Sequence, residues 1–271
     1  MRDGIDINAT GVTVTNCNVT DFGAYGFFLQ NSNDGTLTGD TANDTYVGFF
    51  ISTSSNNTLT GNTASINGAG FEVLNSSADM LMKNKAVNNY DYGFDLAGSL
   101  RSVLKENTAE GNAYGFGFAR SSNNTLASNT SDNNTYGFYL DTNCYGNTFT
   151  GNTADSNGNA GFGLVLSSNS NTLTGNTADD NQYYGFSISV SNDNNLTGNA
   201  ANSNHHSGFF LSGSSKNSLA TNRAMNNTQY GYFDDTTGSG TAGTANFYTD
   251  NTSSGNGSGG SSPSGLGSPQ S

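Results

Sequence analysis

Positive charge is scarce in this sequence. Lysine and arginine together number 8 against 21 aspartates and glutamates in 271 residues, which gives a formal net charge of −13. A chain this acidic repels the phosphate backbone of nucleic acids, and no stripe of basic residues offsets the repulsion. The sequence therefore predicts neither a nucleic-acid partner nor binding to an anionic membrane surface.

Cysteine and long apolar runs are also scarce. The two cysteines, Cys17 and Cys144, lie five to six repeats apart in the register described below, which is at least ~24 Å at ~4.8 Å per coil and too far for a disulfide. No run approaches the ~18 apolar residues of a membrane span. No leader peptide is recognisable before the first repeat, and the abrupt start at Met1 favours a fragment that lacks its native N-terminal cap.

Asparagine and glycine dominate instead, with 43 and 36 residues. Bulk composition of this kind is typical of low-complexity chains, but here it is periodic. A template of L-x-x-N-x-A, then five or six residues, then G-F-x-L recurs every 22–24 residues. The glycine of each template falls at Gly26, Gly48, Gly70, Gly93, Gly115, Gly137, Gly161, Gly185, Gly208 and Gly231.

Short period-2 segments such as F-x-L are typical of strands with one buried face. A repeat of about 22 residues holds three such strands and three turns, so like residues stack on like in successive coils. The sequence predicts an all-β fold, a right-handed single-stranded parallel β-helix (solenoid) of about ten to eleven coils. Helical solenoids are disfavoured because Asn, Gly, Thr and Ser are poor helix formers.

The asparagine slot predicts a ladder of side chains along one turn of the coils. Asn tolerates turn geometry, and its amide both donates and accepts hydrogen bonds, so stacked copies satisfy one another. The ladder residues are Asp40, Asn62, Asn84, Asn107, Asn129, Asn152, Asn176, Asn199 and Asn222.

The pattern weakens toward the C-terminus. Asp234 replaces an inward leucine, and the doublet Asp234–Asp235 is interpreted as a cap, although Tyr248 to Asn251 restores half a template. We therefore predict a β-helix domain over residues 1–251 and a Gly/Ser/Pro-rich flexible tail or linker over 252–271.

The run N-x-L-T-G-N-T-A followed by G-F-x-L resembles the NosD-type right-handed parallel β-helix repeat family over residues 11 to about 256. The resemblance implies a secreted or cell-surface protein linked to polysaccharides. Relatives of this kind include lyases, epimerases and hydrolases as well as adhesins and surface-layer modules. Copper handling, the role of the family's namesake, is not supported, because the sequence has no dense Met/His cluster.

Convergent catalytic groups are not evident in the sequence. Asp179–Asp180 and His205–His206 both lie in the variable segment of a coil and are interpreted as solvated turns. The D-P-H and G-H-G motifs of β-helix epimerases and hydrolases are absent, so no catalytic residue, metal ligand or cofactor is assigned. Binding of Ca²⁺ is the one ion-dependent role that the sequence leaves possible.

One local concentration of charge and aromatic residues suggests a binding site for an acidic sugar polymer. Half of the basic residues fall in two neighbouring coils, next to three tyrosines that each precede a template glycine. The predicted site contains Lys83, Lys85, Arg101, Lys105, Tyr92, Tyr114 and Tyr136. Alternatively, strict period-2 alternation turns the tyrosines into the core, and the charges form an ordinary solvated face on which Lys83 pairs with Glu106.

Threonine rows from repeated T-L-T segments suggest a third type of surface, one that orders water as in ice-binding proteins. Met82, Lys105 and Ala127 interrupt the row, and Thr is a common choice at exposed strand positions.

The sequence thus favours a non-catalytic extracellular or cell-surface module that acts as a rigid structural, adhesive or polysaccharide-binding surface. The alternatives are a polysaccharide lyase, C5-epimerase or glycoside hydrolase of the β-helix class, and an ice-binding surface. A polysaccharide or cell-surface glycan is the expected partner. An exposed first coil also allows end-to-end or lateral self-association.

Overall fold

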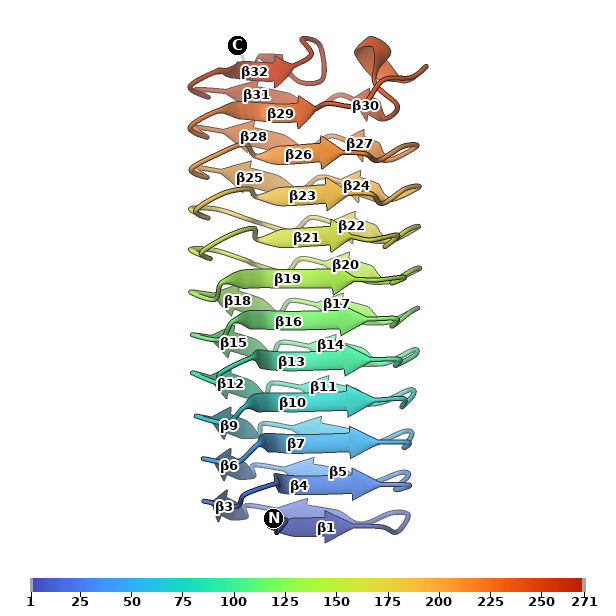
Figure 1. Ribbon diagram of the computed structural model, residues 1–271, viewed down its shortest axis with the longest axis vertical. Helices are drawn as coiled ribbons and strands as arrows, with labels where there is room; N and C mark the ends of the chain where they lie inside the picture. The colour runs from blue at the N-terminus through green and yellow to red at the C-terminus, as the bar shows by residue number, and fades with distance from the viewer. Residues whose placement is uncertain (1, 270–271) are drawn as a thin grey trace.

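The computed structural model describes residues 2–269 and shows a parallel β-helix with an almost continuous stack of coils (Figure 1). Three parallel sheets run along its length. The fold class and coil length predicted from the repeat are confirmed, because each strand pairs with its counterparts 22–24 residues away over most of the chain.

Sheet A forms the face nearest the viewer in Figure 1 and has twelve strands. They are β1 (Ile5–Ile7), β4 (Tyr25–Gln30), β7 (Val47–Ser52), β10 (Ala69–Leu74), β13 (Tyr92–Ala97), β16 (Tyr114–Ala119), β19 (Tyr136–Asp141), β21 (Phe162–Val165), β23 (Phe186–Ser189), β26 (Phe209–Ser212), β29 (Tyr230–Asp234) and β32 (Gly259–Ser262).

Sheet B has eleven strands of three residues each. They are β2 (Thr13–Thr15), β5 (Thr36–Thr38), β8 (Thr58–Thr60), β11 (Met80–Met82), β14 (Val103–Lys105), β17 (Thr125–Ala127), β20 (Thr148–Thr150), β22 (Thr172–Thr174), β24 (Asn195–Thr197), β27 (Ser218–Ala220) and β30 (Phe247–Thr249).

Sheet C is divided into two parts that single parallel bridges connect through Thr153 and Thr177. Its strands are β3 (Asn18–Thr20), β6 (Thr41–Asn43), β9 (Thr63–Ser65), β12 (Lys85–Val87), β15 (Thr108–Glu110), β18 (Thr130–Asp132), β25 (Ala200–Asn202), β28 (Arg223–Met225), β31 (Thr252–Ser254) and β33 (Ser268–Pro269).

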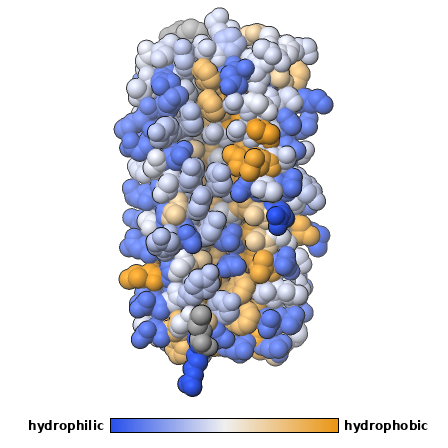
Figure 2. All heavy atoms as spheres, in the orientation of Figure 1, coloured by the Kyte–Doolittle hydropathy of each residue, from blue (hydrophilic) through white to orange (hydrophobic). Residues whose placement is uncertain are grey.

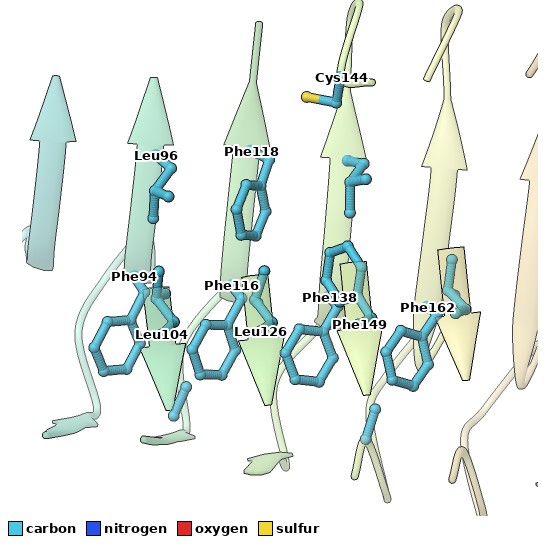
Figure 3. Packing of buried hydrophobic residues seen from close by; sticks show 14 of the residues in the cluster. Phe94, Leu96, Leu104, Phe116, Phe118, Leu126, Phe138, Cys144, Phe149 and Phe162 are labelled. Atoms are coloured by element: carbon cyan, nitrogen blue, oxygen red, sulfur yellow. The ribbon is translucent and has the colours of Figure 1, made fainter. Parts of the chain in front are cut away.

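Stacked apolar side chains fill the interior. The template phenylalanines form one column in which successive rings lie nearly parallel, for example Phe94 on Phe116 at 4.7 Å between ring centroids. Leucines from sheets A and B and alanines from sheet C surround this column and are fully buried (Figure 3). The narrow core has room for Ala in sheet C because each template glycine also faces inward: a Cβ on Gly93 would lie 2.9 Å from the Cβ of Ala109.

Three asparagine ladders line the turns, where the sequence predicted one. The predicted ladder is confirmed: Asn129 donates from its backbone N–H and its Nδ2 to Oδ1 of Asn152, at 2.9 and 3.0 Å, and from Nδ2 to the Leu104 carbonyl. A second ladder includes Asn124, Asn147 and Asn171. A third includes Asn112, Asn134 and Asn157.

A left-handed residue precedes the ladder asparagine in these turns. Gly61, Gly151, Gly175 and Gly198 have φ of 60–66° in front of the predicted ladder, and Lys83 and Glu106 adopt φ of 55–56° there. Such backbone favours Gly and tolerates Asn, which explains why T-G-N and N-N recur.

The predicted boundary after residue 251 is wrong. Strand β31 pairs with β28, β32 pairs with β29, and β33 pairs with β31, so the β-helix continues to residue 269. The Gly/Ser-rich segment keeps the required slots because Asn251 and Asn256 extend two ladders and Ser253 occupies a small inward position. Residues 270 and 271 lie outside the described part of the chain.

Asp234 lies where the regular spacing of the coils ends, but the cap predicted there is wrong, because β32 pairs with the strand that contains Asp234 and continues the β-helix. A longer loop with the 3₁₀ turn η1 (Thr241–Gly243) follows it. The Asp234 carboxylate is buried and accepts hydrogen bonds from the Tyr248 hydroxyl at 2.9 Å and from Nδ2 of Asn246 at 3.0 Å. The aspartate thus satisfies polar groups where the loop departs from the template.

The cysteines are free, as predicted: Cys17 is half-buried and Cys144 is buried. The described residues, 2–269, include no helix long and apolar enough to cross a membrane.

Candidate functional site

The outer face of sheet A carries most of the partly exposed aromatic rings. Period-2 alternation fails at each template glycine, because the glycine and the following phenylalanine both face the core. The residue before the glycine therefore lies outside, and the interpretation that Tyr92, Tyr114 and Tyr136 belong to the core is wrong. Figure 2 views this face, where hydrophobic side chains gather in patches along the rod.

The central patch consists of four tyrosines from three neighbouring strands. Tyr92 stacks on Tyr114 with ring centroids 5.0 Å apart, and Tyr114 stacks on Tyr136 at 5.2 Å. Tyr139, from the outward slot between Phe and Leu, contacts the rings of both Tyr114 and Tyr136. We call these four residues the tyrosine patch.

Two further aromatic patches lie on the same face. Near the N-terminal end, Tyr25 packs against Phe28 and Phe50, each at 4.7 Å between centroids. Toward the C-terminal end, Tyr184 stacks on Phe210 at 4.4 Å and meets His206 edge-on at 4.8 Å. Aromatic rings therefore recur along sheet A rather than at one point.

A pair of carboxylates lies between the N-terminal aromatic patch and the tyrosine patch. Glu72 on β10 and Asp95 on β13 are register partners on adjacent parallel strands, and both occupy the outward slot of the template. Within residues 2–269, neither carboxylate has a hydrogen-bond or salt-bridge partner. Unlike Asp234, these two carboxylates thus have no polar contact that explains their position.

Burial governs the electrostatics of the pair. Burial, together with the smaller effect of the charges of Glu72 and Asp91, raises the pKa of Asp95 to about 7. Burial also raises the pKa of Glu72. Near neutral pH, Asp95 is therefore partly protonated beside its carboxylate neighbour, an arrangement suited to proton donation.

Two small cavities meet at Asp95 and Tyr92. One has a volume of about 200 Å³ and is lined by Glu72, Asp95, Tyr92 and Tyr46 among others. The other, of about 60 Å³, extends from Asp95 and Tyr92 to Tyr139 and Asp141. A wider hollow of about 680 Å³ lies at the corner between sheets C and A, but its lining has no carboxylate or basic side chain.

Glycine in the outward slot makes room for the tyrosine patch. A Cβ on Gly117 would lie 2.5 Å from Cε1 of Tyr92, and one on Gly163 would lie 2.9 Å from Cδ2 of Tyr139. Each ring therefore leans across the next strand because that strand has no side chain at this position.

The structure separates the predicted basic residues from the tyrosines. Lys85 belongs to β12 of sheet C and Lys105 to β14 of sheet B, while Lys83 and Arg101 lie in turns. The predicted Lys83–Glu106 pair is confirmed at 3.6 Å, and Lys105 also contacts Glu106, at 3.3 Å. The binding role assigned to the four basic residues stays a prediction.

The other candidate groups take part in contacts within the fold. Asp179 is half-buried and accepts hydrogen bonds from the backbone N–H and Nδ2 of Asn202, so it is not a freely solvated turn residue. His206 belongs to the C-terminal aromatic patch. Residues 2–269 hold no group of three or more His, Cys, Asp or Glu side chains arranged to bind a metal ion.

The threonine rows lie on sheet B and are interrupted in its middle. Thr60 pairs with Met82, which pairs with Lys105 and then Ala127 before Thr150 resumes the row. A flat uninterrupted threonine array is therefore absent from these strands.

Sequence reasoning missed Glu72, Asp95 and Tyr139. All three occupy the x of G-F-x-L, a slot that the repeat alignment treats as variable. Following that slot alone down the chain gives Phe28, Phe50, Glu72, Asp95, Gly117, Tyr139 and Gly163, and so reveals the two consecutive acids.

Comparison with known proteins agrees with this architecture. A family model described as a right handed beta helix region matches residues 3–154. The chain belongs to this right-handed β-helix family. A second model, described as a periplasmic copper-binding protein (NosD), matches residues 142–262. No curated protein shows significant sequence similarity to the chain.

Solved structures with the same fold include carbohydrate-active proteins. A variant of the periplasmic alginate epimerase AlgG is 18% identical, with a TM-score of 0.77 over 95% of this chain and 73% of that one. The A-module of mannuronan C-5 epimerase AlgE6 from Azotobacter vinelandii is also 18% identical, with a TM-score of 0.71 over 96% and 77%. The catalytic domain of a GH87 α-1,3-glucanase in complex with nigerose is 13% identical, with a TM-score of 0.55 over 94% and 56%. At these identities the likeness shows a shared fold and nothing more.

Proposed function

We propose that this protein is a carbohydrate-active β-helix that binds a neutral polysaccharide lengthwise along the outer face of sheet A. The observation that carries the proposal is the recurrence of half-exposed aromatic rings on that face, from Tyr25 through the tyrosine patch to Phe210. The carbohydrate-active proteins among the structural neighbours support a polysaccharide ligand, whereas the preference for a neutral one rests on the charge of this face.

Aromatic rings suit sugars because the apolar C–H groups of a sugar pack against aromatic carbon. The faces of Tyr114 and Tyr136 cover one another, so a sugar on this patch meets the outward edges of the stacked rings. Coils rise by ~4.8 Å, close to the length of one sugar unit in an extended chain. Rings on neighbouring coils, such as Tyr114 and Tyr136, can therefore contact successive sugars of one polymer. A long shallow face fits a polymer better than it fits a small molecule.

Charge favours a neutral polymer over an acidic one. None of the sheet A strands contains lysine or arginine, whereas Glu72, Asp95 and Asp141 lie among the aromatic rings. An acidic polymer would meet like charge along this face at neutral pH. The prediction of an acidic polymer depended on the basic residues of the predicted site, which lie elsewhere in the coil.

We also place the protein outside the cytoplasm, at the cell surface or in the periplasm, because polysaccharides long enough to cover several coils are encountered there. The periplasmic location of AlgG and of the NosD family supports this assignment. Adhesive or structural use of the rod remains compatible with a glycan-binding face.

The test is retention of the purified chain by immobilised polysaccharides. Neutral glucans and mannans are compared with polygalacturonate and alginate, for the unaltered protein and for the double variant Tyr114→Ala, Tyr139→Ala. We expect retention on at least one neutral polymer and a loss of about 10–100-fold in affinity in the double variant, since it removes two rings that the polymer contacts and each ~1.4 kcal/mol lost is a factor of ten.

Tyr145→Ala is the matched control, because Tyr145 is an exposed tyrosine outside the sheet A strands. Lys83→Ala, Lys105→Ala tests the basic residues. The unaltered protein could instead prefer acidic polymers, with that preference lost in the lysine variant and kept in the tyrosine variant. This result would overturn the proposal and favour the predicted basic site.

A further inference from the structure

We propose that Glu72 and Asp95 are a catalytic pair that hydrolyses a glycosidic bond of the polysaccharide bound along sheet A. The inference rests on the proposed function and assigns a reaction to one point of the binding face. It follows from the geometry of the pair, from the cavities beside it and from the aromatic patches on either side.

Spacing is the first argument. The two residues are direct register partners on adjacent parallel strands, which places their backbones ~4.8 Å apart with both side chains outward. Retaining glycosidases hold their two carboxyl groups ~5–5.5 Å apart, whereas inverting enzymes need ~6.5–9.5 Å to admit a water molecule. A backbone spacing of ~4.8 Å is compatible with the retaining separation, and the configuration of the product decides between the two mechanisms.

Surroundings are the second argument. The cavities of about 200 and 60 Å³ open on either side of Asp95, and Tyr92 lines both. Both carboxylates are half-buried and have no hydrogen-bond or salt-bridge partner within residues 2–269, which leaves their oxygens available to a ligand in the cavity. The N-terminal aromatic patch and the tyrosine patch flank the pair, so a polymer that rests on both patches must cross it.

Protonation is the third argument. Glu72 on β10, Asp91 before β13 and Asp141 on β19 put negative charge near Asp95, and Tyr92, Tyr114 and Tyr139 enclose it. Burial raises the pKa of both residues, that of Asp95 to about 7, so Asp95 keeps its proton at mildly acidic pH and is the member of the pair placed to act as the acid.

The reaction then balances as follows. Asp95 donates its proton to the glycosidic oxygen while the Glu72 carboxylate attacks the anomeric carbon, and the C–O bond breaks to release one saccharide as an alcohol. The Asp95 carboxylate next takes a proton from a water molecule whose oxygen attacks the same carbon. The ester bond to Glu72 breaks, so one glycosidic bond and one water yield two hydroxyl-terminated chains.

The experiment measures retention and new reducing ends in the same samples, with the full chain and each neutral polysaccharide of the panel. We expect cleavage by the unaltered protein. Asp95→Asn and Glu72→Gln should each lower the rate at least 100-fold and leave retention unchanged. Glu110→Gln, an acid on the exposed side of sheet C, is the matched control and should cleave normally.

Two further measurements identify the roles of Glu72 and Asp95. The newly formed reducing end should at first have the anomeric configuration of the cleaved bond, and azide should restore cleavage in Glu72→Ala by yielding a glycosyl azide. The rate should fall above pH about 7 as Asp95 loses its proton, and Asp95→Asn should remove that alkaline limb from its residual activity.

The outcomes separate the two proposals. Retention without new reducing ends would overturn the catalytic pair and leave the binding face standing, as would cleavage that survives Glu72→Gln and Asp95→Asn. Absence of both retention and cleavage on every neutral polymer would overturn the binding face and the catalytic pair together.

Discussion

The turns and the outer face of sheet A follow opposite rules within the same coils. In the turns, each coil repeats the same asparagine with the same bonds, as in Asn107, Asn129 and Asn152. On the outer face of sheet A, one slot changes from Glu72 to Asp95 to Gly117 to Tyr139 in four successive coils. Repetition marks the scaffold, and departure from repetition marks the surface on which we place function.

The strongest way to test this contrast is to break a ladder. Asn129→Leu removes the acceptor of both Asn107 donors and the donor to the Leu104 carbonyl, all in the interior. Each buried unpaired group costs about 1–3 kcal/mol, so the three groups predict a loss of at least about 3 kcal/mol in the free energy of unfolding. Urea titration measures it.

The exposed Asn18 on β3 provides the control for that variant. Asn18→Leu should change the free energy of unfolding by about 0.5 kcal/mol or less, as is usual at surface positions. Equal effects of the two variants would contradict the ladder as the main support of the turns.

An aspartate within a ladder offers a second test, with a sign set by pH. Asp79 occupies a ladder position, and its Oδ2 is buried without a partner among residues 2–269, where an asparagine would donate. Burial raises the pKa of Asp79 to about 6, and its hydrogen bonds from Asn57 only partly offset this. The folded state therefore binds the proton more tightly than the unfolded state.

Stability must fall as the pH rises from about 4 to about 6, and above that the full penalty applies. Asp79→Asn should raise the free energy of unfolding by about 2–3 kcal/mol at pH 8, since one pKa unit corresponds to about 1.4 kcal/mol. The gain should nearly vanish at pH 3.5. A gain that is independent of pH would show that titration of Asp79 does not matter.

Two glycines of the same strand sharpen the comparison further. Gly115 faces the core, where an added Cβ would lie 2.8 Å from the Gly137 carbonyl, whereas Gly117 faces out beneath the Tyr92 ring. Gly115→Ala should cost about 1–3 kcal/mol by overpacking. Gly117→Ala should leave the melting midpoint nearly unchanged and weaken retention on a neutral polysaccharide several-fold, because the Tyr92 ring must move.

Surface charge should have the smallest effect. The Lys83–Glu106 pair is exposed and its N–O distance is 3.6 Å. Lys83→Ala should therefore change the free energy of unfolding by less than about 1 kcal/mol, and less still in 1 M salt. A larger effect in thermal denaturation would give these basic residues a structural importance that the contacts do not indicate.

The sequence predicted the fold and the register of the interior because each buried slot tolerates few residues. Phe, Leu, Ala and Asn recur at fixed spacing, and their columns lie where the template puts them. Two of the three ladders were missed because the asparagines that precede the template Leu and Gly lie in segments whose length varies between repeats. Asn112 and Asn134 nevertheless keep one position relative to the template glycine.

The site was harder to predict, for a physical reason. Two consecutive inward residues, such as Gly93 and Phe94, shift the alternation by one and turn Tyr92 outward. Composition also suggested a flexible tail after residue 251, whereas backbone pairing and the amides of Asn251 and Asn256 keep that segment in the β-helix. Where few side chains pack, sequence patterns carry little information.

One measurement tests the central claim most directly. It is the retention of the double variant Tyr114→Ala, Tyr139→Ala on the neutral polysaccharide that best retains the unaltered chain. The account predicts a melting midpoint within a few degrees of that of the unaltered chain and a loss of most of the affinity. Undiminished retention by a folded double variant would show that the polymer is bound elsewhere and would contradict the assignment of function to the outer face of sheet A.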